Sequence, residues 1–365
     1  MMTKKVSRKD AKAQRKARKD VVESLFILKA FFVSCFAPLR LCGLCFLLLC
    51  NALAHAQDAA PSPQDNPQTL EAGDTIRVEA DLVDLNVTVL GSDPRRAFGQ
   101  LEQKNFSVFE DGTPQEISFF SSADTPFDLV LLLDLSGSTA DKIKLIRKSA
   151  TSFVEAARPT DRIAIATFTD TLEIVSPMTF DREDLKARIK KMRKPKGGTN
   201  FWDALRYVLE TMLNPERNVR RSAVVVMTDG VDNALPDVNG PGSVTRFEEL
   251  RAMVSRSASI VIPIYLDTER EMISNRSNYS AHAFQMARQQ LVLLADESGS
   301  RAYLARKVED LKDVYQQVIR DLSTVYSIGY LPANKTRDGA WRNIKVELVG
   351  RPDLAARTKR GYFAK

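Results

Sequence analysis

A carboxylate and two hydroxyls follow one strongly apolar stretch of the sequence. Residues 129–133 read LVLLL, and the run ends on Asp134, with Ser136 and Ser138 two and four positions later. Five consecutive apolar residues are typical of a parallel strand that is buried on both faces. Because open α/β sheets bind ligands at the carboxyl edge of such strands, these three side chains are candidates for a binding site.

Two further stretches place similar side chains after an apolar or a glycine-rich segment. Residues 223–227 read AVVVM and lead into Thr228 and Asp229, while Thr199 follows a Gly-Gly pair and precedes a predicted helix. The side chains that would then share one edge of the sheet are Asp134, Ser136, Ser138, Thr199 and Asp229. All of them offer oxygen, which suits a hard divalent cation such as Mg²⁺.

The segments DLSGS, GGT and TDG occur in this order at the predicted strand ends. They resemble the metal-ion-dependent adhesion site of the von Willebrand factor A (VWFA) domain, whose pattern is Asp-x-Ser-x-Ser, then Thr, then Asp, and all five positions are filled here. The resemblance covers about residues 127–325. It implies a Rossmann-like, doubly wound and mostly parallel α/β sheet, a bound Mg²⁺ (or Mn²⁺ or Ca²⁺), and a protein partner whose Glu or Asp carboxylate completes the coordination of the metal.

Taken singly, these residues also have a simpler interpretation. An aspartate or serine after a strand often caps the following helix, which would account for Asp134, Ser136 and Ser138 without any ligand. All five positions together favour the metal site. We therefore expect divalent-cation-dependent protein recognition or adhesion; the alternative is a structural envelope protein in which the metal only braces the loops.

The competing hypothesis is that the protein is an enzyme, and the sequence lacks the motifs that catalysis would need. Position 136 is Ser, so the Asp-x-Asp pair of a phosphoryl-transfer site is absent. Ser136 lacks the first glycine of a G-x-S-x-G nucleophile elbow, and the Gly-Gly-Thr199 loop lacks the lysine of a P-loop. His282 is the only histidine after residue 56. We therefore predict that the protein is not an enzyme, with a metal-dependent hydrolase as the least favoured reading.

The positive charge of the chain lies in its first 56 residues. These carry eleven Lys and Arg against three acidic residues, a net charge of +8, whereas the whole chain has +7. The remaining residues therefore have a net charge of −1. A nucleic-acid-binding protein would concentrate basic residues on its folded domain, so this distribution excludes nucleic acid as the expected partner.

The same 56 residues predict export. A basic region precedes the apolar residues 41–54, and Ala54-His55-Ala56 resembles a signal-peptide cleavage site. One alternative is an uncleaved membrane anchor, since apolar residues begin at position 25, although Lys29, Pro38 and Arg40 interrupt that run. Another is a lipoprotein at Cys50, although residues 47–49 are all leucine and lack the small residues that such a site usually has. All four cysteines of the chain lie in this leader, at positions 35, 42, 45 and 50. We expect a periplasmic, cell-surface or secreted protein whose folded part holds neither disulfides nor thiolate metal sites.

The remaining sequence divides by its periodicity. Residues 57–73 are rich in Pro, Gln, Asp and Ala and predict a disordered spacer. Residues 74–122 alternate as strands, residues 127–325 alternate strands with helices, and residues 326–365 return to strand patterns. We expect the strands of 74–122 and 326–365 to pair in one β-sandwich, with the α/β domain inserted between them. This arrangement, with an FEDG turn before and an arginine-rich segment ending GYF after the inserted domain, resembles the VWFA-related subgroup frequent in Acidobacteria.

A loop rich in Pro, Gly and Asn follows Asp229. It places Asp232, Asn233 and Asp237 close to the predicted metal site, so we expect these residues to shape partner specificity. A second cation site and ordinary turn chemistry are the alternatives for the same residues.

Overall fold

The computed structural model describes residues 82–91, 99–193, 197–213, 220–274 and 280–364. All of them belong to one compact unit, residues 77–365. The predicted leader (1–56) and spacer (57–73) lie outside the described residues. Within the described ranges, no helix combines the length and the apolar character needed to cross a bilayer.

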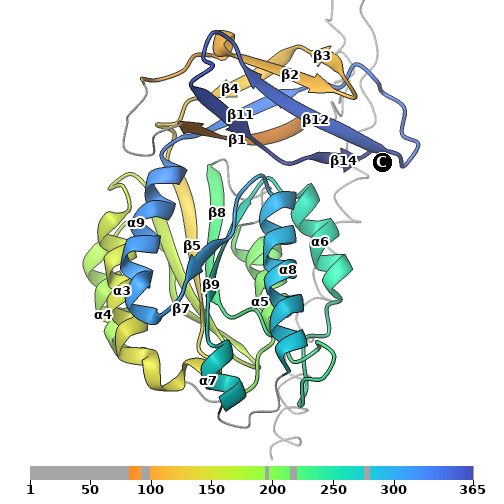
Figure 1. The fold of residues 1–365 in the computed structure, drawn as a ribbon. Coiled ribbons are helices and arrows are strands. Elements are labelled where there is room, and N and C mark those ends of the chain that lie inside the picture. The colour runs from red at the N-terminus through yellow and green to blue at the C-terminus, as the bar shows by residue number, and fades with distance from the viewer. Residues whose placement is uncertain (1–81, 92–98, 194–196, 214–219, 275–279, 365) are drawn as a thin grey trace, which may run out of the picture. The chain divides into compact units, whose positions relative to one another are not determined.

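A six-stranded sheet forms the centre of the α/β part (Figure 1). Its strand order is β10-β9-β8-β5-β6-β7, and every neighbouring pair is parallel except β6 and β7. The strands are β5 (Phe127–Asp134), β6 (Arg162–Phe168), β7 (Leu172–Thr179), β8 (Arg221–Thr228), β9 (Ile260–Leu266) and β10 (Tyr303–Ala305).

Strand β5 lies in the middle of this sheet, and all eight of its residues are buried. Side chains alternate between the two faces of a strand. Leu129, Leu131 and Leu133 therefore pack on one face and Val130 and Leu132 on the other. Burial on both faces explains why this strand is a continuous apolar run rather than an alternating one.

Helices cover both faces of the sheet, as Figure 1 shows. The first face is covered by α3 (Ile143–Ala156), α4 (Arg182–Lys191) and α9 (Leu311–Leu322). The second face is covered by α5 (Phe201–Tyr207), α6 (Phe247–Arg256) and α8 (Ala281–Glu297), while α7 (Glu269–Ser274) is a short helix after β9. The predicted doubly wound α/β fold is confirmed.

Two four-stranded antiparallel sheets form a β-sandwich from both flanks of this domain. One sheet has the order β13-β1-β11-β4 and the other β14-β12-β2-β3. The strands are β1 (Val83–Gly91), β2 (Phe106–Glu110), β3 (Thr113–Gln115), β4 (Ile117–Ser121), β11 (Val325–Tyr330), β12 (Trp341–Leu348), β13 (Leu354–Arg357) and β14 (Gly361–Phe363). Since β1 pairs with β11 and β2 with β12, strands from before and after the α/β part join as predicted.

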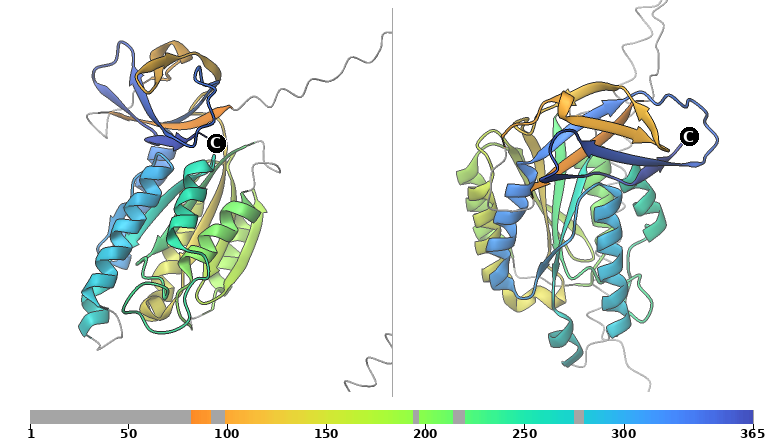
Figure 2. Two further views of the ribbon diagram at one scale, coloured as in Figure 1. Left: turned by 90° about the vertical axis from the view of Figure 1, so that its right-hand side faces the viewer. Right: turned by 45° about the horizontal axis from the view of Figure 1, so that its top comes forward.

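The sandwich contacts the α/β part at the amino edge of the central sheet. Arg221, the first residue of β8, donates hydrogen bonds to the carbonyls of Ala123 (3.1 Å) and Val325 (2.5 Å). Asn86 of β1 donates to the carbonyl of Ala258 at 2.8 Å, just before β9. Figures 1 and 2 show the sandwich at this end of the sheet from three directions. The carboxyl edge, where β5 ends on Asp134, therefore stays clear of it.

Two segments differ from the periodicity of the sequence. Residues 201–213 predict one helix, but α5 ends at Tyr207 and a π-helical turn, Val208–Met212, follows. Residues 355–363 predict one strand, but they form β13 and β14, which belong to different sheets. A turn at residues 358–360 separates them. Since both sheets offer a free edge to a short strand, the apolar pattern alone does not distinguish these arrangements.

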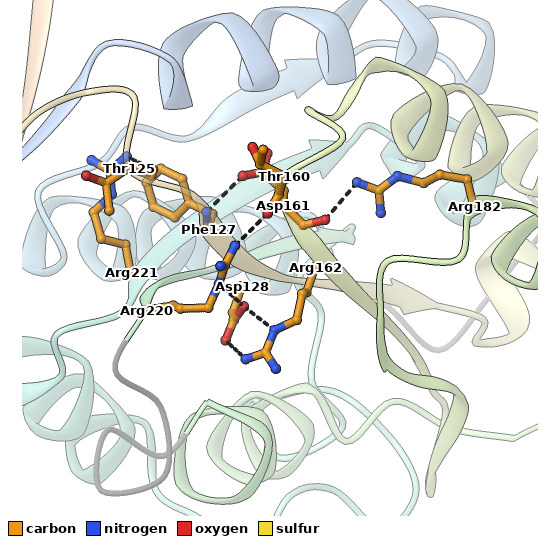
Figure 3. A network of polar contacts seen from close by, with 9 residues as sticks. All are labelled: Thr125, Phe127, Asp128, Thr160, Asp161, Arg162, Arg182, Arg220 and Arg221. Atoms are coloured by element: carbon orange, nitrogen blue, oxygen red, sulfur yellow. Dashed lines mark hydrogen bonds and ion pairs between the residues drawn. The ribbon is translucent and has the colours of Figure 1, made fainter.

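A buried ion-pair network stabilises the amino edge of the central sheet (Figure 3). The Asp128 carboxylate is fully buried and accepts hydrogen bonds from Arg162 Nε at 2.8 Å and from Arg220 Nε at 3.0 Å. Both guanidinium groups are about a third exposed. Next to them, Asp161 accepts the N–H of Phe127 at 2.8 Å, which holds the start of β5. The network connects strands β5, β6 and β8.

We predict that Asp128→Asn lowers the free energy of unfolding by about 2 kcal/mol, because removing one partner leaves two arginines without their anion. The value is below that for a fully buried pair, since solvent screens the exposed arginines. Urea unfolding measures the change. Asp184→Asn is the control: Asp184 pairs with Arg188 on the surface of α4 at 2.6 Å, and its loss is expected to cost under about 1 kcal/mol. Equal losses in both variants would contradict a stabilising role for the Asp128 network.

Candidate metal centre

Asp134 is the last residue of β5, and hydrogen bonds determine where its carboxylate points. Oδ1 accepts the N–H of Ser136 at 2.9 Å, and Oδ2 accepts the hydroxyl of Thr228 at 2.6 Å. Thr228 is adjacent because β5 and β8 are parallel, with Leu133 opposite Met227. The carboxylate is fully buried. Two adjacent parallel strands thus position one carboxylate at the edge of the sheet.

Asp229 is the first residue after β8 and is likewise buried. Its Oδ2 accepts the hydroxyl of Thr268 at 2.8 Å, and its Oδ1 accepts the N–H of Val231 at 3.2 Å. The chain turns sharply at the next residue, Gly230, with φ +75°. This positive φ strains any other residue at position 230, and a Cβ there would also lie 2.9 Å from Leu291 Cδ1. The hydrogen bonds with Thr268 and Val231 hold the Asp229 carboxylate at this end of β8.

The two carboxylates interact electrostatically. Burial, and next the negative charge of Asp229, raise the pKa of Asp134 from 3.8 to about 7. The hydrogen bonds from Ser136 and Thr228 oppose this rise. Two buried like charges at close range disfavour ionisation of both groups.

Ser136 lies between β5 and the 3₁₀ helix Gly137–Lys142. It is buried, and its hydroxyl makes a hydrogen bond with the Asp134 carboxylate. Thr139 holds this turn closed, because its hydroxyl donates to the carbonyls of Asp134 (3.2 Å) and Ser136 (3.0 Å). The backbone of Ser138 belongs to the 3₁₀ helix, but its side chain is outside the described part of the structure.

The glycine-rich loop brings Thr199 to the same edge. Thr199 is buried, and its carbonyl accepts the N–H of Asn233 at 2.9 Å while its own N–H donates to Asn233 Oδ1 at 3.3 Å. A Cβ at Gly198 would lie 2.4 Å from Asn233 Nδ2, so this approach requires glycine. A Cβ at Gly137 would lie 3.9 Å from the carbonyl oxygen of Gly197. The loops that carry Ser136, Thr199 and Asp229 are therefore neighbours.

The three residues of the loop after Asp229 lie in different environments. Asp232 is fully buried, and its carboxylate accepts the N–H groups of Trp202 (3.0 Å), Ala234 (2.8 Å) and Ser243 (3.0 Å). Asn233 holds the Thr199 loop, as described above. Asp237 is exposed and has a positive φ of 64°. Asp232 and Asn233 thus hold the loops around the candidate site through hydrogen bonds. Of the three residues, only Asp237 is exposed to solvent.

Two hydroxyls that orient the carboxylates are not among the predicted site residues. Thr228 holds Asp134, and Thr268 holds Asp229. Each follows or ends an apolar strand, β8 or β9, so both share the strand-end position of the predicted residues. The strand-end position is the feature of the sequence that could have identified these two hydroxyls. It does not distinguish a hydroxyl that orients a carboxylate from one that binds a metal.

The donor set fits a hard dication. Its atoms are carboxylate and hydroxyl oxygens, the ligands that Mg²⁺ and Mn²⁺ prefer. Within the described residues no three His, Cys, Asp or Glu side chains gather in one group. A cation between Asp134 and Asp229 would relieve the repulsion that raises the pKa of Asp134.

Several solved structures are similar to part of this chain. Among solved structures, proximal thread matrix protein 1 from the mussel byssus is 15% identical with a TM-score of 0.41, and the alignment covers 56% of this chain and 47% of that one. The structure of the same protein with a zinc-occupied MIDAS motif is 16% identical with a TM-score of 0.42, and its alignment covers 56% of this chain and 47% of that one. The vWF domain of the type V pili tip protein Mfa5 from Porphyromonas gingivalis is 13% identical with a TM-score of 0.41. That alignment covers 54% of this chain and 94% of that one. This chain therefore spans about half the length of the mussel protein.

Among curated proteins, none matches the chain. The model of the von Willebrand factor type A domain matches residues 128–317, slightly more than half of the chain. The matched range begins in β5 and ends in α9, so it covers the six-stranded sheet and the helices on both of its faces. The chain belongs to the von Willebrand factor type A domain family.

Proposed function

We propose that this protein binds a divalent cation through Asp134, Ser136, Ser138, Thr199 and Asp229, and that the cation recognises an acidic side chain of a protein partner. The observation that carries the proposal is the pair of buried carboxylates, Asp134 and Asp229, at the ends of adjacent strands. Buried charges are normally paired or bound to a metal. The hydroxyls of Ser136 and Thr199 lie on the two loops beside this pair.

The chemistry of such a site explains why a partner would bind. Neutral hydroxyls compensate the charge of a dication only weakly, and Mg²⁺ keeps several waters in its octahedral shell. When bound, the cation supplies an electrophilic position for one more anionic ligand. A Glu or Asp carboxylate of the partner fits that position. The exposed Asp237 lies on the adjoining loop and would contact the partner at its periphery.

We infer an exported location from the leader, either cleaved after Ala56 or retained as an anchor. The partner is then a periplasmic, cell-surface or secreted protein. The absence of cysteine from residues 51–365 agrees with a fold that needs no disulfide in that compartment. Residues 57–73 would serve as the spacer between the leader and the folded part.

We predict that Asp134→Ala and Asp229→Ala abolish Mg²⁺ and Mn²⁺ binding in calorimetric titration, because each removes half of the anionic charge of the site. Asp237→Ala is the matched control, since it removes an exposed carboxylate from the adjoining loop and is expected to bind the metal as the unmodified chain does. Circular dichroism verifies that each variant is folded. Unchanged metal binding in either of the first two variants would refute the assignment.

A second prediction concerns stability in the absence of metal. Between about pH 4 and pH 7 the folded chain retains a proton on Asp134 that the unfolded chain has lost, so this group lowers the unfolding free energy as the pH rises. Asp134→Asn does not titrate. Without metal, the variant should be more stable than the unmodified chain by on the order of 1–3 kcal/mol at pH 8, and the difference should vanish towards pH 4. A difference that is constant with pH, or that has the opposite sign, contradicts the electrostatic coupling.

A third prediction separates recognition from loop bracing. The immobilised chain should retain an envelope protein in Mg²⁺ and release it in chelator, and the Asp134→Ala chain should retain none. If chelator lowers only the melting temperature of the isolated chain, and the retained proteins are the same for the unmodified and the Asp134→Ala chains, the metal braces the loops and recognition is excluded.

A further inference from the structure

A cavity lies far from the candidate metal centre, where the sandwich meets the α/β part. Its volume is about 670 Å³, within the range of small-molecule sites in proteins. The walls come from the start of β1, the end of α6, the loop after β11, and β14 with the turn before it. These elements stand at the amino edge of the central sheet, opposite Asp134.

The lining of this cavity is strongly cationic. Four basic side chains and a single carboxylate face it: Arg256, Lys335, Arg337, Lys359 and Asp84. Among the described residues, no acidic group lies within ion-pair distance of Arg256, Lys335 or Lys359. The three cations without such a partner attract an anion.

Lys359 is the basic residue that the fold holds most firmly. Its neighbours Arg357 and Arg360 both bind Asp296 of α8, at 3.2 Å and 2.9 Å. Gly299 packs against the backbone below them, since a Cβ there would lie 2.8 Å from Lys359 N. The arginine-rich segment noted in the sequence therefore pins its own turn to the α/β part.

The side chain of Lys359 lines the cavity. It is partly buried, and burial lowers the pKa of Lys359 while the charge of Asp84 opposes that shift. Asp84 acts on Lys359 from beyond ion-pair distance, so the partly buried ammonium still gains more from an anionic ligand than one in bulk water, because the lower local dielectric strengthens the attraction.

Apolar side chains border the same cavity. Leu82, Leu331 and Phe363 line it and are between 41% and 57% exposed. Tyr362 also lines it, although its hydroxyl is engaged with Glu110 at 3.0 Å. A fully hydrated inorganic anion would leave this apolar surface in water, whereas a ligand with an apolar body would cover it.

We propose that this cavity binds a small amphiphilic organic anion, with its carboxylate or phosphate on Lys359 and Arg256 and its apolar part against Leu331 and Phe363. The site is independent of the candidate metal centre and needs no divalent cation. The ligand would bind at the junction between the sandwich and the von Willebrand factor A domain.

Calorimetric titration of the full chain with octanoate tests the proposal. Acetate has the same charge without the apolar chain, and 1-octanol has the chain without the charge. We expect octanoate to bind more tightly than either, with an affinity that chelator leaves unchanged. Equal binding of octanoate and acetate, of octanoate and octanol, or no octanoate binding overturns the proposal.

Matched variants locate the binding. Lys359→Met keeps much of the side-chain volume but removes the charge, and is expected to weaken octanoate binding about tenfold. Lys359→Arg should retain most of it. Lys312→Met, at an exposed position of α9, should change nothing, and any octanoate bound by the leader is common to all variants. If Lys359→Met does not fold, Arg256→Met replaces it. Equal affinity in the charge-removing and control variants overturns the assignment.

Discussion

The mutual approach of two buried carboxylates is the constraint on which the carboxyl edge of this sheet depends. Asp134 and Asp229 end or follow adjacent parallel strands, and neither has access to enough water to dissipate its charge. Hydroxyls and backbone N–H groups hold both carboxylates in place. Their hydrogen bonds do not cancel the burial and the repulsion from Asp229 that raise the pKa of Asp134. Two buried carboxylates that repel each other cost stability, and carboxylates perturbed in this way are candidates for a functional site.

The remaining architecture maintains this arrangement. The ion pairs of Asp128 with Arg162 and Arg220 join β5, β6 and β8 at the opposite edge, which keeps β5 and β8 in register along their length. Buried Asp232 and Asn233 place the glycine-rich loop beside the carboxylates. The β-sandwich adds its contacts at the amino edge through Arg221 and leaves the site open.

Much of this could be predicted from the residues because each signal is local. The apolar run before Asp134 specifies a strand buried on both faces, and the alternation with helices specifies a parallel sheet, so the sheet-edge position of Asp134, Thr199 and Asp229 follows. The pairing of the two flanking strand groups was also predictable, since neither flank has enough strands to form a sandwich alone.

Other features depend on contacts between distant residues and left no periodic signal. The roles of Thr228 and Thr268 arise from register across β5, β8 and β9, which no local pattern encodes. The structural role of Asp232 was not foreseen, because its donors, Trp202 and Ser243, lie 30 and 11 residues away. The cationic cavity likewise requires the end of α6 and the turn before β14 to meet. A single sequence does not indicate that Arg357 and Arg360 are engaged with Asp296 while Lys359 is not.

The most direct measurement is anomalous diffraction from crystals of the protein grown with Mn²⁺. If Asp134 and Asp229 hold a cation, one strong anomalous peak is expected at the carboxyl edge of the central sheet, within coordination or single-water distance of Asp134, Ser136, Thr199 and Asp229. An edge without such a peak at saturating Mn²⁺, or a peak only at Asp237 or another exposed carboxylate, would contradict this assignment.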